Sequence, residues 1–231
     1  MKTIAIIPAA GSGTRMGAET NKLFLHLDKK PILIHTLEVF EASQAIDGVL
    51  LVVKPEEELE ILALLKEHKI QKVIKCLAGG AERQDSIQNA IAALPKDATH
   101  VVVHDGARPF IKPSQVNDLV DQLKEKSSVI MAVPAKDTVK RVSPTGLVNE
   151  TLDRSELWQI QTPQGFEREA IERAYELART HRYRGTDDAS LMENAGLPVH
   201  VTLGDYQNIK VTTEVDLVFG EAILKHRQGS K

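Results

Sequence analysis

The stretch TIAIIPAAGSGTRMGAETNK (residues 3–22) begins as an apolar run and continues as a glycine-rich loop. A short apolar run that ends in such a loop is typical of the first strand of an α/β sheet, where backbone N–H groups approach a phosphate. The stretch therefore predicts a phosphate-binding strand–loop unit near the start of the chain. The spacing of its glycines distinguishes between the kinds of unit.

Further apolar runs predict the rest of the sheet. They are GVLLVV (48–53), KVIKCL (72–77), HVVVH (100–104) and SVIMAV (128–133). Amphipathic helical patterns lie between them and start near Pro31, Pro55, Arg83 and Lys112. This alternation predicts a doubly wound, mostly parallel, Rossmann-like sheet. Ligands of such sheets bind at the carboxyl ends of the strands.

The alternation is interrupted at about residues 136–156, where a polar segment surrounds the turn sequence SPTG (143–146). This segment predicts a protruding β-hairpin arm. Because a lone hairpin is marginally stable in water, we expect the arm to pack on something else, such as a second subunit. Beyond it we expect a strand in LWQIQTPQGF (157–166), helices from Arg168 and from TDDAS (186–190), a strand in PVHVTLG (198–204) and a last helix from Thr213. We expect residues 1–231 to form a single domain.

Composition limits the partners of the chain. Its 231 residues carry a formal net charge of −3, so we expect no nucleic acid and no membrane as partner. The single cysteine, Cys76, rules out an intrachain disulfide. The N-terminal apolar run is too short for a signal peptide. Together these features predict a cytoplasmic location.

Neither of two familiar glycine-loop patterns fits the opening loop. A dinucleotide fingerprint starting at Gly11 requires a glycine at position 16, and so does a P-loop. Met16 stands there instead. The remaining features are flexible glycines followed by two cations, Arg15 and Lys22, which suit a triphosphate. The alternative is a tight turn with two solvated cations.

Other candidate residues follow the predicted strands. In HDGARP, Asp105 and Arg108 lie just beyond one strand, where Asp105 could accept hydroxyl hydrogen bonds, orient a metal shell or simply cap a turn. His100 and His104 lie four residues apart and could form a metal pair. We favour the simpler interpretation that His104 makes hydrogen bonds beneath a loop.

Several motifs, in order, resemble one family over nearly the whole chain. They are PAAGSGTRM, LAGGAERQDSI, VVVHDGARPF, VPAKDTVKRV, TLDRSELWQIQTPQGF, TDDASLMENAG and NIKVTTEVDL. Together they resemble the methylerythritol phosphate cytidylyltransferase family of the non-mevalonate isoprenoid pathway. The resemblance implies transfer of a cytidylyl group from CTP to 2-C-methyl-D-erythritol 4-phosphate. Alternatives are a ribitol phosphate cytidylyltransferase and a non-catalytic nucleotide sensor on the same scaffold.

The resemblance also implies roles for individual residues. The catalytic residues it implies are Arg15, Lys22, Arg154 and Lys210. The nucleotide-binding residues it implies are Pro8, Ala9, Ala10, Gly11, Ser12, Gly13, Gly80, Ala81 and Ser86. The substrate-binding residues it implies are Asp105, Arg108, Thr138, Arg154, Thr162 and Lys210.

A cofactor and a partner subunit complete these expectations. We expect one essential Mg²⁺, held mainly by CTP phosphates and water, with Asp105 as a possible ligand. The resemblance implies a homodimer in which the arm carries Thr138 and Arg154 to the partner's site. A phosphate nucleophile, with a second pKa of about 6, is largely dianionic at neutral pH and requires no general base.

Overall fold

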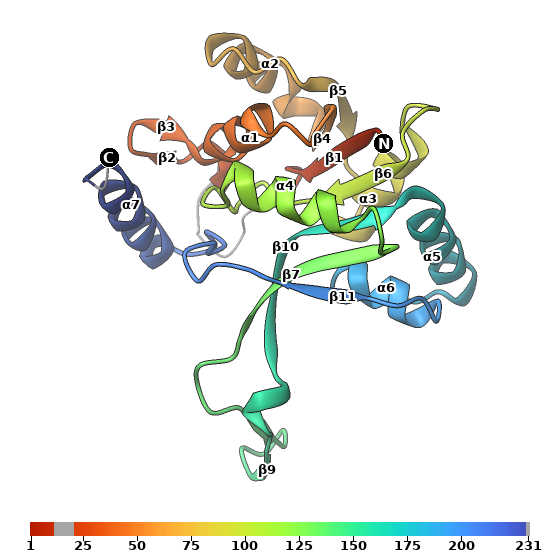
Figure 1. Ribbon diagram of the computed structural model, residues 1–231. Helices are drawn as coiled ribbons and strands as arrows, with labels where there is room; N and C mark the ends of the chain where they lie inside the picture. Colours follow the sequence, from red (N-terminus) through yellow and green to blue (C-terminus); the bar gives the residue numbers. More distant parts are fainter. Residues whose placement is uncertain (12–20, 230–231) are drawn as a thin grey trace.

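A mixed β-sheet forms the centre of the computed structural model, which describes residues 1–11 and 21–229 (Figure 1). Within these residues seven strands run in the order β11-β7-β10-β6-β1-β4-β5. All neighbouring strands are parallel except β10, which runs antiparallel to both β6 and β7. The predicted doubly wound, mostly parallel fold is confirmed.

The strand positions agree closely with the apolar runs in the sequence. The sheet strands are β1 (Thr3–Pro8), β4 (Gly48–Val53), β5 (Val73–Ala78), β6 (His100–Val103), β7 (Ser128–Pro134), β10 (Trp158–Glu167) and β11 (His200–Leu203). A small hairpin of β2 (His26–Leu27) and β3 (Lys30–Pro31) was not predicted. Its two-residue strands are too short to produce an alternating pattern.

Helices cover both faces of the sheet. They are α1 (Ile32–Ala42), α2 (Glu58–Glu67), α3 (Arg83–Ala92), α4 (Pro113–Gln122), α5 (Arg168–His181), α6 (Asp188–Asn194) and α7 (Glu214–Gly229). Short 3₁₀ turns are η2 (Lys22–Phe24), η3 (Pro55–Glu57) and η4 (Arg154–Glu156). One hydrophobic cluster joins the sheet to α1, α2 and α4, and the other joins it to α3, α5 and α6.

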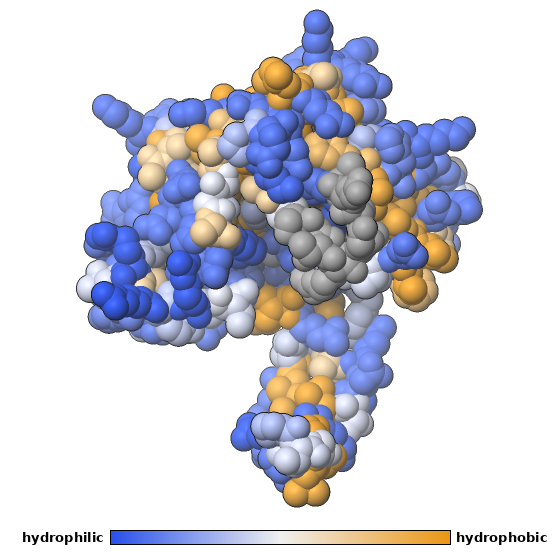
Figure 2. Space-filling model, turned by 180° about the vertical axis from the view of Figure 1, so that it is seen from behind, coloured by the Kyte–Doolittle hydropathy of each residue, from blue (hydrophilic) through white to orange (hydrophobic). Residues whose placement is uncertain are grey.

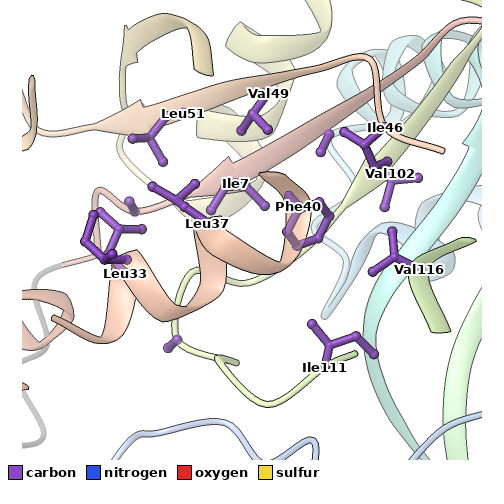
Figure 3. Packing of buried hydrophobic residues seen from close by; sticks show 14 of the residues in the cluster. Ile7, Leu33, Leu37, Phe40, Ile46, Val49, Leu51, Val102, Ile111 and Val116 are labelled. Carbon is purple, nitrogen blue, oxygen red and sulfur yellow. The ribbon is translucent and has the colours of Figure 1, made fainter. Parts of the chain in front are cut away.

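Alternation along the strands divides these two cores. Ile7 of β1 faces the α1 side with Leu37 and Phe40, whereas Ile6 faces the α3 side (Figure 3). Side chains of successive strand residues point to opposite faces, so a strand covered on both faces is apolar throughout. This is why the apolar runs located the strands so closely.

The order of the strands creates a crevice between β1 and β6. From β1 the chain builds outward through β4 and β5, and then returns to β6 on the other side of β1. The strand order therefore reverses between two parallel neighbours, which leaves their carboxyl ends open to a ligand. The described start of the glycine-rich loop, up to Gly11, follows β1, and Asp105 follows β6, so the fold brings both to this crevice.

The arm (residues 136–156) projects from the sheet between β7 and β10 (Figure 1). It contains β8 (Lys140–Val142) and β9 (Val148–Thr151), which pair antiparallel around the predicted turn. Apolar side chains are exposed along it and at its root, as Figure 2 shows. They are Val139, Val142, Leu147, Val148, Trp158 and Ile160.

Candidate active site

A cleft of about 480 Å³ lies at the carboxyl ends of β1, β5 and β6. Five separate segments contribute to its lining, including the loop between β11 and α7. The lining residues are Pro8, Ala10, Gly11, Lys22, Leu23, Gly80, Ala81, Glu82, Arg83, Ser86, Asp105, Gly106, Ala107, Lys210 and Thr212. Many of the residues implied by the family resemblance are therefore brought together. Ser12, Gly13 and Arg15 lie outside the described residues.

Asp105 is the centre of charge in this cleft. Its Oδ1 lies 3.2 Å from Arg83 Nε, and its Oδ2 lies 2.7 Å from Lys210 Nζ and 3.7 Å from Arg108 Nε. Burial alone would raise the pKa of this carboxyl, but Arg83 and Lys210 outweigh burial and hold it well below its usual range. Asp105 therefore stays ionised and holds cations from three segments.

The backbone beneath Asp105 rests on two buried side chains. Its N–H donates to Thr162 Oγ1 at 3.1 Å, and Thr162 Oγ1 lies 3.1 Å from His104 Nδ1. His104 Nε2 lies 3.0 Å from the carbonyl oxygen of Arg108, which can only accept. His104 therefore carries its proton on Nε2, and its Nδ1 accepts from the Thr162 hydroxyl. This confirms the hydrogen-bonded interpretation of His104.

Burial keeps His104 neutral. The side chain is fully buried, and this lowers its pKa to about 4. A neutral ring has one donor and one acceptor nitrogen, which matches the two partners observed. Thr162 and His104 therefore act on the cleft through the position of Asp105, because the Thr162 hydroxyl already joins Asp105 N–H to His104.

Lys210 is placed by the loop that leads into α7. In that loop the buried Asn208 donates from Nδ2 to Thr162 O at 2.8 Å, and its backbone carbonyl accepts from Arg108 Nη1 at 2.8 Å. Next to Lys210, the N–H of Val211 donates to Ala107 O at 2.8 Å. These bonds attach the loop to β10 and to the turn after β6. Lys210 is consequently held against Asp105.

Lys22 reaches the same loop from the other side of the cleft. Its Nζ donates to the carbonyl of Val211 at 3.0 Å, one residue beyond Lys210. The preceding Asn21 donates to Ala9 O at 2.9 Å and caps the 3₁₀ turn by accepting from Leu23 N at 3.2 Å. Asn21 thus ties the return of the glycine-rich loop to the end of β1, where Ala9 is buried.

The loop after β5 is shaped by two glycines. A Cβ on Gly79 would lie 2.5 Å from Ala10 Cβ, and one on Gly80 would lie 2.4 Å from Asp85 Cβ, closer than real side chains approach. Gly80 N–H donates to Ser86 Oγ at 3.0 Å, so the loop folds back onto the start of α3. Gly80, Ala81 and Ser86 therefore face the cleft together.

The arm residues lie elsewhere. Arg154 Nη1 donates to Lys136 O at 2.6 Å, and Arg154 lines a second cavity of about 620 Å³ with Pro134, Ala135, Lys136, Asp153, Ser155 and Trp158. Within the described part of the chain this cavity shares no lining residue with the cleft. Thr138 is exposed on the arm. One chain does not bring Arg154 and Thr138 to Lys210.

Sequence reasoning missed Arg83, Asn21 and Asn208. Arg83 opens α3 and looks like an ordinary first-turn residue, although its position after a strand end placed it near the crevice. The two asparagines give a weaker signal in the sequence, because a polar residue next to Lys22 or Ile209 does not by itself indicate a structural role. Their importance depends on backbone partners that no local pattern reveals.

Comparison with known proteins identifies the family. A family model described as 2-C-methyl-D-erythritol 4-phosphate cytidylyltransferase matches residues 3–226. The chain belongs to this family. As a member of the cytidylyltransferase family, it is a nucleotidyltransferase enzyme.

Individual relatives agree with the family model. The chain is 48% identical to a cytidylyltransferase of this name from Lysinibacillus sphaericus, with 98% of this chain and 97% of the relative covered. It is 45% identical to one from Pelotomaculum thermopropionicum, with 99% of this chain and 96% of the relative covered. The crystal structure of 4-diphosphocytidyl-2C-methyl-D-erythritol synthase from Anaerococcus prevotii is similar, with a TM-score of 0.86, 32% identity and coverage of 97% and 98%.

The alternative functions and the question of a membrane span can now be addressed. The family model and the relatives name methylerythritol phosphate, so the ribitol phosphate alternative and the sensor alternative are not favoured. Among the described residues, none of the helices has the length and apolar character needed to cross a membrane.

Proposed function

We propose that the cleft between β1 and β6 is where the family's reaction takes place in this chain. The chain transfers a cytidylyl group from CTP to 2-C-methyl-D-erythritol 4-phosphate and releases pyrophosphate. The observation that supports this location is the convergence of Lys22, Lys210 and Asp105 at the switch point of the sheet. Residues 1–231 would act as a single domain that carries the arm.

The reaction needs positive charge and alignment more than proton transfer. An oxygen of the methylerythritol phosphate attacks the α-phosphorus of CTP in line, and the bond from that phosphorus to the bridging oxygen of the leaving pyrophosphate breaks. The attacking phosphate is largely dianionic at neutral pH, as its second pKa is about 6. The barrier is repulsion between anions, and preorganised cations reduce it.

Lys22 and Lys210 are the described cations suited to this task. Lys22 donates a hydrogen bond to the carbonyl of Val211, and Lys210, the residue before Val211, contacts Asp105. Both lysines therefore lie at the same loop. We assign Lys22 to the triphosphate, together with Arg15 from the expected loop. Lys210, which Asp105 holds in place, would stabilise charge on the phosphate that attacks and on the leaving group.

The nucleotide would lie along the backbone of two loops. Pro8, Ala10 and Gly11 line the cleft after β1, and together with Ser12 and Gly13 they would approach the phosphates. Gly80, Ala81 and Ser86 line it after β5. Their backbone amide and carbonyl groups can separate the amino edge of cytosine from the carbonyl edge of uracil. We assign the base to this second loop.

The residues of the cleft fit a magnesium ion held mainly by phosphate oxygens and water. In residues 1–11 and 21–229 there is no cluster of three or more His, Cys, Asp or Glu side chains that could hold a metal. Glu82 and Asp105 are the carboxylates in the lining, and Asp105 is the more buried. Mg²⁺ keeps several waters and binds through substrate phosphates, and when bound it supplies positive charge to them.

The arm would act on a second subunit. Its exposed apolar side chains favour contact with another surface. Arg154 and Thr138 lie away from the cleft of their own chain, so a homodimer would let them hold the methylerythritol phosphate in the partner's cleft. Arg154 would then orient the nucleophile, with Arg108 and Thr162 acting from beneath Asp105.

The experiment measures pyrophosphate release in the presence of CTP, Mg²⁺ and either methylerythritol phosphate or ribitol phosphate. Lys210→Met should lower kcat/KM by about a hundredfold, since one preorganised donor stabilises a transition state by roughly 3 kcal/mol. Lys225→Met is the matched control, because this exposed lysine on α7 lies outside the cleft. Wild-type activity in Lys210→Met would contradict the proposal that the reaction takes place in this cleft. Release with ribitol phosphate alone would contradict the substrate.

A further inference from the structure

Arg83 joins the cleft to a buried polar group behind it. Its Nε faces Asp105 Oδ1 at 3.2 Å, while its Nη2 donates to Asp188 Oδ2 at 2.8 Å. The other carboxylate oxygen of Asp188 accepts from the hydroxyl of Tyr175 at 2.6 Å. Asp188 is 1% exposed and Tyr175 is 3% exposed. One guanidinium group therefore bridges an acid in the cleft and an acid in the interior.

The charges in this group support one another. A buried carboxylate is costly unless it is paired and hydrogen-bonded, and Arg83 and Tyr175 supply both to Asp188. Burial alone would lower the pKa of Arg83, but Asp188 and Asp105 outweigh burial and raise it. Burial and the neighbouring Asp188 raise the pKa of Tyr175, so its hydroxyl keeps the proton it donates.

Helix capping does not account for Asp188. The N-cap of α6 is the preceding residue, Asp187, whose Oδ1 accepts from Ser190 N at 3.0 Å. Asp188 is the first helical residue, and both of its oxygens face other side chains instead of the helix backbone. At the start of α6, Asp187 thus caps the helix, while Asp188 binds Arg83 and Tyr175.

We propose that Asp188 and Tyr175 are positioning residues of the reaction, acting on the cleft through Arg83 and Asp105. Asp188 fixes the guanidinium from behind, so that its Nε edge is directed at Asp105. Asp105 in turn holds Lys210. This inference rests on the proposed function, because it requires that Asp105 and Lys210 act on the substrates.

The chemical reason lies in the number of cations near Asp105. Arg83, Arg108 and Lys210 all face its carboxylate. An arginine at the cleft wall without a second anchor could turn toward the triphosphate, which binds guanidinium groups strongly. Asp188 anchors Arg83 on the side away from the cleft. Lys210 then keeps its 2.7 Å contact with Asp105 while the phosphates are brought into line.

A double-mutant cycle tests this chain of contacts. Asp188→Asn should lower kcat/KM for CTP about tenfold in the wild-type background. In the Asp105→Asn background it should lower kcat/KM less than twofold, because the group through which it acts is already altered. Tyr175→Phe removes only the hydroxyl, and should lower kcat/KM about threefold in the first background and have no effect in the second. If Asp188→Asn does not fold, the Tyr175→Phe cycle decides.

The matched control is Glu176→Gln on the same helix as Tyr175. Glu176 pairs with Arg179 on the exposed face of α5, and its loss should leave kcat/KM unchanged in both backgrounds. Equal effects of Asp188→Asn with and without Asp105 would overturn the positioning role. Full activity of Asp105→Asn alone would instead contradict the proposed function of the cleft. The two failures are thus separate results.

Discussion

His104 is a single side chain whose burial decides its chemistry. In the folded chain its pKa is about 4, against the ordinary value of 6.5. Between these two values an unfolded chain binds a proton here that the folded chain does not. The free energy of unfolding therefore decreases as the pH falls through this window. The hydrogen bonds to Thr162 and Arg108 depend on the neutral ring.

This gives a prediction for stability against pH. Between pH 7 and pH 4.5 the wild-type chain should lose about 2 kcal/mol of unfolding free energy because of this one histidine. His104→Gln can keep a donor and an acceptor but does not titrate, so its loss over the same range should be smaller by that amount. Urea unfolding at several pH values measures both. Burial also lowers the pKa of His35 and His100. The wild-type chain and His104→Gln share the effect of these two histidines on stability, so it cancels in the comparison. If the unfolding free energies of the wild-type chain and His104→Gln fell in parallel with pH, the lowered pKa would not belong to His104.

Residue-level contacts mark the limit of what the sequence predicts. The positions after β1, β5 and β6 could be assigned to one crevice, because carboxyl ends of parallel strands meet. The pairing of Arg83 with Asp188 could not, since the two lie 105 residues apart on different helices. TDDAS was predicted to start a helix, and α6 does begin there, with Asp187 as its N-cap.

The arm is the element whose role depends most on a partner. Among the residues that the structure describes, its two short strands pair only with each other, and both are exposed along their whole length. A hairpin of this kind gains little stability from its own contacts. Apolar residues at its surface would be better accommodated against another chain.

Removing the arm should therefore change the assembly. A chain in which residues 139–153 are replaced by a short glycine-rich turn should be monomeric, whereas the full chain should be dimeric. Light scattering measures the mass of each. Thermal unfolding serves as the control, because the core contains no residue of the deleted segment. A dimer of the shortened chain would assign the interface to another surface.

Element types were more predictable than element directions. The apolar runs gave the strand positions to within a residue or two, because a strand covered on both faces admits few polar residues. The strand after the arm was expected, but its antiparallel course between β6 and β7 was not. A pattern within one strand reports how it is buried and carries no information on its neighbours.

At the scale of the whole molecule, a shared site can be tested by mixing subunits. Arg154→Ala and Lys210→Ala should each be nearly inactive. A hybrid dimer of the two would contain one site with an intact Lys210 from one chain and an intact Arg154 from the other. Its second site would lack both side chains. Such a dimer should recover up to half of the wild-type turnover, whereas each variant alone should recover none.

The measurement is pyrophosphate release after the two variants are unfolded together and refolded as a mixture. As the control, each variant is refolded separately, and the two are mixed and assayed immediately, before subunits can exchange between the dimers. Mixtures that stay inactive, although hybrids are detected by mass, would place Arg154 in the site of its own chain.

The position of β10 in the sheet sets the order in which the chain can assemble. β6 and β7 are made first, but they are separated in the sheet by β10, which is complete only at residue 167. Until then β6 pairs with β1 on one side and has an open edge on the other, and β7 has no strand to pair with. Open edges invite pairing with other chains. The newly made protein is therefore exposed to aggregation until β10, the strand that follows the arm, is complete and joins the two halves of the sheet.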